Sequence, residues 1–573
     1  MRCLFAGTAL ASLLVKPALA VWPAPQSFSN GTAALQLSPS FEIHSMGALA
    51  DSAPAGLAAA IERASSQLSS DCFSRLVVDR GESDRDAVEK APTLSRLVLS
   101  LESGEAGALA DEIHQAYENR DEVYTLSIPA TASSKRNKKR DGDGITATLF
   151  ANSTLGLIRG LQTFTQLVYT LPSSETRYIP NAPIEISDAP AFPHRAFMLD
   201  TSRNFFPVDD IFRTLEAMAS VKLSTLHWHA TDSQSWPLFI PSFPNLTAGA
   251  YSSAEVYSWH DVYRVQDYAA GLGIDIMLEI DMPGHTASIY DTFPQYIACH
   301  EAAPWSTHAN EPPAGQLRLG DNATLAFAKD VVKSVTSLSS SQYFSTGGDE
   351  VNELCYMEDP VTGGVMNSTG ASLDDLLMTF VSGLHETVRA AGKTPVVWEE
   401  MVLDHPMGLE NDTVVLVWVS SDNIVKVAEK GYRIIHAASD YFYLDCGHGG
   451  WVGNNVEGNS WCDPFKTWQK MYSFDPLGNL TESQQSLVLG GQSLVWTEQT
   501  SPQNLDQVVW PRAAAAAEVF WTGGNLEDGK RDVKEALPRL HDWRYRAVAR
   551  GINAAPLQPH WCALRPQLCN VDA

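Results

Sequence analysis

Short apolar runs alternate with amphipathic segments over the chain from Ala191 onward. Apolar runs bounded by turn residues are typical of buried strands, and apolar residues three or four positions apart indicate helices. We expect strands at 195–200, 224–230, 274–280, 343–347, 395–398, 414–419, 433–437 and 487–496. Helices are expected at 207–221, 260–271, 323–338, 373–391, 421–430 and 510–521. Eight strands alternating with helices predict a parallel sheet that closes into a (β/α)8 barrel, an α/β fold.

The preceding segment, residues 21–188, has the pattern of a smaller α+β domain. Strands are expected at 97–101, 123–128 and 144–150, and a helix at 155–169. Residues 135–140, Lys-Arg-Asn-Lys-Lys-Arg, form a basic, solvated loop between two of these strands. The loop is also a candidate processing site for a protease that cuts after paired basic residues, so this domain includes a potential propeptide region. We therefore divide the chain into 21–188, a catalytic barrel at 189–545 and a C-terminal tail at 546–573.

The first twenty residues resemble a secretory signal peptide. Arg2 gives a positive start, an apolar stretch follows, and residues 18–20 have the Ala-Leu-Ala form of a cleavage site. No later stretch is apolar over the ~20 residues that a membrane span requires. Glycosylation sequons support export and begin at Asn30, Asn152, Asn245, Asn322, Asn367, Asn411 and Asn479. We expect a secreted, extracellular glycoprotein.

Eight cysteines agree with this route, because exported proteins form disulfides. Cys3 leaves with the signal peptide. By proximity along the chain, Cys562 pairs with Cys569 and Cys446 with Cys462, and Cys299 with Cys355 is the remaining plausible pair. Cys72 is then unpaired, either buried or free.

The composition is that of a globular protein, with 44% hydrophobic and 19% charged residues. A net charge of −27 at pH 7 disfavours nucleic acid and anionic membranes as partners. A neutral substrate fits this charge better, although the charge could equally serve solubility alone.

Carboxylates and tryptophans follow the predicted strands. In (β/α)8 barrels the active site is formed at the carboxyl ends of the strands. The residues expected there are Asp232, Glu279, Asp281, His285, Asp349, Glu350, Trp398, Glu399, Glu400, Trp418, Tyr443, Asp445, Trp496 and Glu498. Aromatic rings cover the apolar face of a sugar, and carboxylates accept hydrogen bonds from its hydroxyl groups. The alternative is that any single one of these residues serves packing or capping.

A zinc site is a second alternative. His227 and His229 lie two residues apart on one strand, so both imidazoles could reach one ion. A catalytic zinc also needs a third ligand, and His285 is the only further histidine at a matching strand end. We favour supporting roles for His229 and His285, and we expect no metal and no cofactor.

Asp349 and Glu350 are the key pair. Most glycosidases place an acid and a separate nucleophile on opposite sides of the scissile bond. Adjacent residues of an extended chain point in different directions and cannot easily form such a flanking pair. They can instead divide the labour, with one reaching the leaving oxygen and the other the substrate.

Several motifs resemble those of the family 20 β-N-acetylhexosaminidases. The segment Gly347-Gly-Asp-Glu-Val351 is similar to the family signature. Further similar blocks occur in family order at 195–203, 227–236, 279–285, 443–445 and 490–498. The resemblance covers residues 195 to about 521, extends to the N-terminal domain, and is strongest to secreted fungal enzymes.

The resemblance implies a retaining, exo-acting hydrolase in which the 2-acetamido oxygen of the substrate is the nucleophile. It makes Glu350 the general acid and then base. Asp349 orients the acetamido N–H and Tyr443 bonds its oxygen. The sugar would be walled by Trp398, Trp418 and Trp496 and held by Arg195, Asp445 and Glu498. Asp232 and His285 would support Glu350, whose pKa a nearby carboxylate should raise.

One departure from the pattern is Ser233, where lysosomal members usually carry a second aspartate. The expected substrates are chito-oligosaccharides and glycans that end in GlcNAc or GalNAc. A catalytically inactive glycan-binding relative is the alternative from another class. The preferred sugar and chain length are left open, and the family's habit of dimerising suggests a homodimer.

Overall fold

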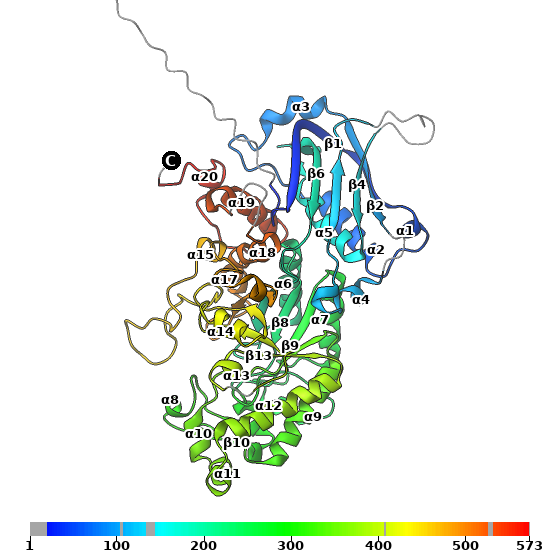
Figure 1. The fold of residues 1–573 in the computed structure, drawn as a ribbon. Coiled ribbons are helices and arrows are strands. Elements are labelled where there is room, and N and C mark those ends of the chain that lie inside the picture. Colours follow the sequence, from blue (N-terminus) through cyan, green and yellow to red (C-terminus); the bar gives the residue numbers. More distant parts are fainter. Residues whose placement is uncertain (1–19, 103–106, 133–143, 406–407, 525–530, 572–573) are drawn as a thin grey trace, which may run out of the picture.

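The computed structural model describes residues 20–102, 107–132, 144–405, 408–524 and 531–571 (Figure 1). Residues 1–19 of the expected signal peptide and the basic loop 135–140 lie outside these ranges. Among the described residues, no helix has the length and hydropathy that crossing a membrane requires.

The N-terminal domain is built on a six-stranded mixed sheet in the order β1-β2-β4-β3-β6-β5. Its strands are β1 (Ser27–Ser45), β2 (Thr93–Leu101), β3 (Tyr124–Ile128), β4 (Ile145–Ala151), β5 (Tyr169–Thr170) and β6 (Arg177–Asp188). Helices α2 (Leu57–Ser70) and α5 (Thr154–Gln166) pack together beside it. The three predicted strands and the predicted helix are present. The long strands β1 and β6, which pair antiparallel, were not predicted.

The second domain is a closed parallel barrel, in the order β12-β13-β14-β15-β16-β7-β8-β9. Its strands are β7 (His194–Asp200), β8 (Thr225–His229), β9 (Asp275–Glu279), β12 (Tyr343–Ser345), β13 (Thr394–Trp398), β14 (Val414–Val417), β15 (Arg433–His436) and β16 (Val488–Val495). All eight predicted strands are confirmed. Their residues are almost all buried, because the parallel sheet is covered on both faces.

Six predicted helices surround the barrel. They are α6 (Val208–Ser220), α7 (Trp259–Gly271), α9 (Asn322–Leu338), α12 (Leu373–Ala390), α14 (Asn423–Glu429) and α18 (Arg512–Thr522). The alanine run 513–517 of α18 is buried where the helix packs against β7 and β16. Small side chains there let the helix approach the sheet closely.

Helix α19 (Val533–Ala549) crosses the boundary that we placed between residues 545 and 546. The C-terminal segment is therefore not a separate tail. Its helix packs beside the N-terminal domain (Figure 1), where Tyr169 donates a hydrogen bond of 3.1 Å to Asp542. Arg546 also donates one of 3.0 Å to the carbonyl oxygen of Val168. This segment thus joins the two domains.

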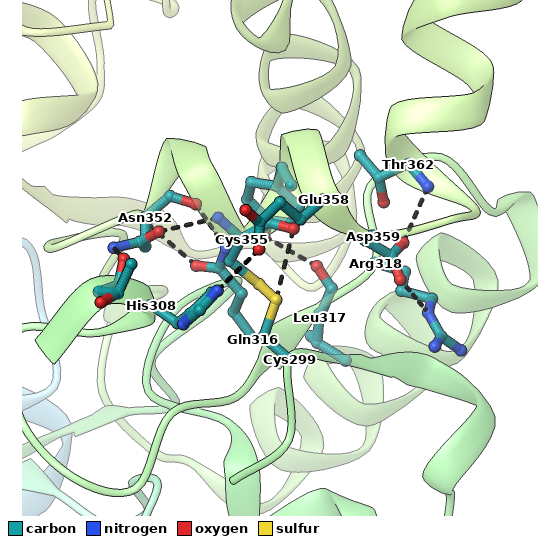
Figure 2. Close-up of a disulfide and its surroundings, with 12 residues drawn as sticks. Cys299, His308, Gln316, Leu317, Arg318, Asn352, Cys355, Glu358, Asp359 and Thr362 are labelled. Atoms are coloured by element: carbon teal, nitrogen blue, oxygen red, sulfur yellow. Dashed lines mark hydrogen bonds and ion pairs between the residues drawn. A yellow bond between two sulfur atoms is a disulfide. The ribbon is translucent and has the colours of Figure 1, made fainter. Parts of the chain in front are cut away.

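Three disulfides confirm the predicted pairs, Cys299–Cys355, Cys446–Cys462 and Cys562–Cys569, and Cys72 is exposed and free. The first ties the residue after the short strand β10 (Ile297–Ala298) to α10 (Glu353–Glu358), which begins three residues after Glu350 (Figure 2). The side chain of Gln316 accepts a hydrogen bond of 3.1 Å from the backbone N–H of Asn352 and donates one of 2.7 Å to its carbonyl oxygen. The segment that follows the catalytic candidates is therefore fixed.

Candidate active site

One cavity opens at the carboxyl ends of the barrel strands, with a volume of about 460 Å³. Most residues predicted for the site line it: His285, Asp349, Glu350, Trp418, Tyr443, Asp445, Trp496 and Glu498. Asp232 and His229 are buried directly behind this wall. The barrel therefore brings together residues that are up to about 300 positions apart in the sequence, as parallel strands that end at one rim require.

The turn after β12 presents Asp349 and Glu350. Gly347 and Gly348 have φ angles of +64° and +100°, and a Cβ on Gly347 would lie 1.9 Å from an oxygen of Asp281. Only glycine fits this position. Glu350 itself has a φ of +55°, an uncommon conformation for a residue with a side chain. This tight backbone lets two adjacent carboxylates both line the cavity.

Asp281, which we expected at this rim without a specific role, lies beside Asp349. Asp281 accepts a 2.8 Å hydrogen bond from the backbone N–H of Gly348, which holds the turn against β9. Burial raises the pKa of both carboxyl groups, and the charge of Asp349 raises that of Asp281 further. Because of these raised pKa values, the two carboxyl groups can share one proton, which removes the repulsion between two neighbouring negative charges.

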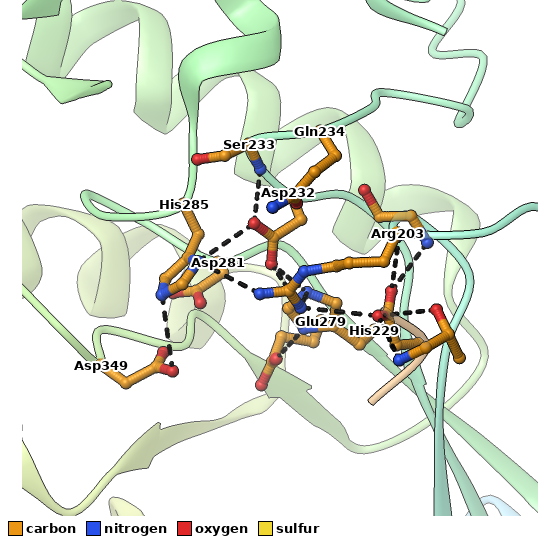
Figure 3. Close-up of polar contacts among 12 residues, drawn as sticks. Arg203, His229, Asp232, Ser233, Gln234, Glu279, Asp281, His285 and Asp349 are labelled. Atoms are coloured by element: carbon orange, nitrogen blue, oxygen red, sulfur yellow. Dashed lines mark hydrogen bonds and ion pairs between the residues drawn. The ribbon is translucent and has the colours of Figure 1, made fainter. Parts of the chain in front are cut away.

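His285 connects Glu350 to Asp232. Its Nε2 lies 3.3 Å from Glu350. The same nitrogen lies 3.8 Å from Asp349, and its Nδ1 lies 3.0 Å from Asp232 (Figure 3). Burial lowers the pKa of His285, but Asp232 and the two catalytic candidates raise it well above its ordinary value. The imidazole is therefore a cation that donates to carboxylates on both sides.

The charge on His285 corrects our expectation for Glu350. Burial raises the pKa of Glu350, but the hydrogen bond and charge of His285 outweigh burial and leave this pKa below its ordinary value. We expected a neighbouring carboxylate to raise it. The proton therefore resides on His285, one hydrogen bond away from Glu350.

His229 supports Asp232 from below. Its Nε2 lies 2.8 Å from Asp232, and its Nδ1 lies 2.6 Å from Glu279. His227 lies 3.1 Å from the other oxygen of Glu279. Both ring nitrogens of His229 are thus engaged by carboxylates inside the barrel, and His227 is fully buried. A catalytic zinc needs free histidine nitrogens and one open coordination position. Because the nitrogens of His229 are bonded to carboxylates and His227 is buried, these contacts support a structural role for both histidines.

Arg195 does not reach the cavity. It is the second residue of β7, so about 17 Å of strand separates it from the carboxyl end at Asp200. It is fully buried and pairs with Glu122 of the N-terminal domain at 2.7 Å. The predicted contact of Arg195 with the substrate is wrong, because the amino end of a barrel strand lies at the opposite end of the barrel from its carboxyl end, where the cavity opens.

Arg203, three residues beyond the end of β7, is the arginine that lines the cavity. It pairs with Asp232 at 2.8 Å, donates to Glu311 at 2.9 Å and stacks on the ring of Trp496 at 4.9 Å. The signal was present in the sequence, because Arg203 closes the same motif that Arg195 opens. The two arginines differ in their position: Arg195 lies near the amino end of β7, and Arg203 lies just beyond its carboxyl end.

Aromatic rings form one side of the cavity. Trp418 stacks near Tyr443 with centroids 6.1 Å apart, and Trp461, which we did not predict, lies edge-on to both at 5.7 and 5.8 Å. Trp398 is fully buried, does not line the cavity, and lies 6.1 Å behind Trp496. Its contact with a sugar stays a prediction.

Two further carboxyl groups line the other side. Burial raises the pKa of Asp445 to about 7, and burial together with Glu311 raises that of Glu498 well above its ordinary value. Burial likewise raises the pKa of Tyr443, so its phenol is a neutral donor. The cavity thus combines hydrogen-bonding groups with flat apolar rings, the combination that suits a sugar.

A (β/α)8 barrel with paired carboxylates and tryptophans around one cavity defines the class of glycoside hydrolases. Comparison with known families gives the same result: residues 192–524 match the catalytic domain of glycosyl hydrolase family 20, and residues 21–167 match a domain described as beta-acetyl hexosaminidase like. The chain belongs to glycosyl hydrolase family 20.

Relatives match along most of the chain. A beta-hexosaminidase of Arthroderma benhamiae is 38% identical over 502 residues, which are 84% of this chain and 79% of the relative. A chitooligosaccharidolytic beta-N-acetylglucosaminidase of Bombyx mori is 35% identical over 466 residues, 78% of this chain and 75% of the relative. The crystal structure of Flavobacterium johnsoniae chitobiase shares the fold, with a TM-score of 0.72, 24% identity, and coverage of 93% of this chain and 73% of that one.

Proposed function

We propose that this hydrolase is an exo-acting β-N-acetylhexosaminidase that removes terminal GlcNAc or GalNAc from chito-oligosaccharides and glycans, with retention of configuration. The observation that carries the proposal is the placement of Asp349 and Tyr443 in the same cavity as Glu350. One pair of adjacent residues can then serve both the leaving group and the acetamido group of the substrate.

In the proposed first step the acetamido carbonyl oxygen attacks C1 of the sugar. The bond from C1 to the leaving oxygen breaks, and Glu350 gives that oxygen a proton. Asp349 accepts a hydrogen bond from the acetamido N–H and balances the positive charge that forms on the new ring. Tyr443 donates to the acetamido oxygen. A forming cation also lowers the pKa of Asp349, so the anion is present when it is needed.

In the second step Glu350 takes a proton from a water molecule, which attacks C1 and opens the cyclic intermediate. His285 and Asp232 position Glu350, and His285 holds the proton that Glu350 delivers. The remaining hydroxyl groups of the sugar are held by Arg203, Asp445 and Glu498, and its apolar face packs on Trp418 and Trp496. Arg203 thus takes the place that we first gave to Arg195.

The source of the nucleophile is the decisive test. Nitrophenyl GlcNAc should be cleaved, and nitrophenyl glucoside hardly at all, because glucose lacks the acetamido oxygen and leaves the partners of that group unpaired. A thiazoline mimic of the cyclic intermediate should bind far more tightly than GlcNAc. A covalent adduct with a 2-fluoro sugar on any carboxylate would contradict the mechanism. A chain that binds GlcNAc without cleaving it would instead be an inactive glycan-binding relative.

The acid is tested by Glu350→Gln, which keeps the shape and removes the proton. Poor leaving groups should lose roughly 10²–10⁴-fold in rate, and activated leaving groups less, because they need less protonation. Equal losses for both kinds of substrate would argue against this role.

We also propose that the protein is secreted and glycosylated. Six of the seven sequon asparagines are exposed, and Asn30 is half-buried, so enzymes of the secretory pathway could reach them. Three disulfides support an oxidising compartment. Mass spectrometry of glycans on the secreted protein would test this; a retained, unmodified chain would oppose it.

A further inference from the structure

The rim of the cavity carries exposed apolar side chains on one side. Trp451 is 40% exposed, Val452 43% and Trp461 67%, and all three line the cavity. Large apolar side chains gathered at the mouth of a site indicate an interaction surface, because their exposure to water is unfavourable. The carboxylates Asp232 and Asp349 are buried. The rim is therefore suited to the flat face of a neutral sugar rather than to a charged partner.

The loop that carries this rim is held at its base. The Cys446–Cys462 disulfide closes it, and both cysteines are buried. A hydrogen bond of 3.2 Å from the N–H of Gly450 to the carbonyl oxygen of Gly458 joins its two arms next to Trp451. A surface fixed before binding loses little conformational freedom when a ligand arrives.

The two tryptophans of this loop differ in their contacts with the aromatic rings of the site. Trp461 contacts the rings of Trp418 and Tyr443, which border the sugar whose bond is cleaved. Trp451 is stacked with no aromatic ring of the described chain, although it lines the same cavity. Its ring is therefore not in contact with the rings that border the cleaved sugar, and its face is open to another part of the substrate.

We propose that Trp451 binds the second sugar of the leaving group, so that the enzyme prefers chito-oligosaccharides of three or more sugars. The inference rests on the proposed function, because it extends the same site outward. A β-1,4-linked chain whose terminal sugar fills the cavity must leave over the rim. There the second leaving sugar can stack on the Trp451 ring, while a disaccharide ends before reaching it.

The experiment compares Trp451→Ala with the wild-type enzyme on nitrophenyl GlcNAc and on N-acetylated di-, tri- and tetrasaccharides. We expect the ratio of kcat/KM for the trisaccharide to that for the disaccharide to fall roughly tenfold, the equivalent of about 1.4 kcal/mol. Trp451→Phe should restore most of the ratio, because a ring can still stack. An unchanged ratio in Trp451→Ala would overturn the proposal, as would an equal loss on all four substrates.

A matched control is Trp561→Ala, since Trp561 is 53% exposed on the C-terminal segment and does not line the cavity. This variant should keep the wild-type ratio; a fall there too would overturn the assignment to Trp451. A wild-type enzyme inactive on nitrophenyl GlcNAc would refute the proposed function itself. Wild-type activity with an unaltered Trp451→Ala ratio would refute only the inference.

Discussion

Replacing Asp232 with asparagine should move the pH profile of the enzyme. Asp232 is fully buried and lies 3.0 Å from His285, 2.8 Å from His229 and 2.8 Å from Arg203. Asparagine keeps the size of the side chain and removes its charge. The substitution therefore tests whether this carboxylate maintains the imidazolium that adjoins Glu350.

The sign follows from the proton shared by His285 and Glu350. The pKa of Glu350 lies below its ordinary value and that of His285 above, so between these values the pair holds one proton, on His285. Catalysis needs that proton on Glu350, and kcat/KM should fall as the pH rises through the raised pKa of His285. Loss of a charge in contact lowers such a pKa by roughly 1–3 units. The alkaline limb in Asp232→Asn should move to lower pH by that amount.

The assay is kcat/KM for nitrophenyl GlcNAc between about pH 3 and pH 9, with pH corrections for the colour of nitrophenol. A thermal melt at each pH separates loss of activity from unfolding. Asp200→Asn is the matched control, because Asp200 lies 3.6 Å from Arg203 and bonds Thr497 without contacting His285. An alkaline limb that stays in place in Asp232→Asn, or moves equally in both variants, would refute the reasoning.

Two further predictions rest on single contacts, and a third rests on the basic run at 135–140. Glu400 accepts a 2.8 Å hydrogen bond from the indole N–H of Trp418, so Glu400→Leu should raise KM about tenfold. Glu400→Gln keeps an acceptor and should leave KM near the wild-type value. In a Trp418→Phe background, which lacks the indole N–H, Glu400→Leu should cause no further rise in KM. Arg195→Met should lower the free energy of unfolding by about 3 kcal/mol, measured by denaturant titration, with KM unaltered, because it breaks a buried pair with Glu122 outside the cavity. Processing at residues 139–140 should yield a new N-terminus at Asp141 by intact mass, and a single uncut chain would contradict it.

Much of the barrel could be predicted because its signal is local. Each strand is a short apolar run, each helix an amphipathic segment, and their alternation permits few topologies. Two of the three disulfides followed from proximity along the chain, and Cys299–Cys355 was the remaining plausible pair. The N-terminal sheet was predicted less completely, because the alternation in β1 is weak: most of its residues are only half-buried or exposed.

The candidate site was predicted where a motif and a strand end coincide, as at Asp349 and Glu350. A site residue was wrongly predicted where we recognised the motif but did not consider how far along the strand the residue lies. Arg195 and Arg203 belong to one motif, yet they lie at opposite ends of the barrel. Trp461 was missed because it follows no strand, and a disulfide loop brings it to the cavity.

The sequence by itself determined the fold class, the family and the residue types that gather at one rim, because strand order and local pattern are written along the chain. Only the tertiary structure decided which of these residues meet, and in which protonation state. The pKa of His285 depends on burial and on the charges of Asp232 and Asp349, and the pKa of Glu350 depends on burial and on the charge of His285. These four residues follow three different strands of the barrel. Electrostatic interactions act through space, so contacts between distant segments fix them, and no local pattern encodes those contacts.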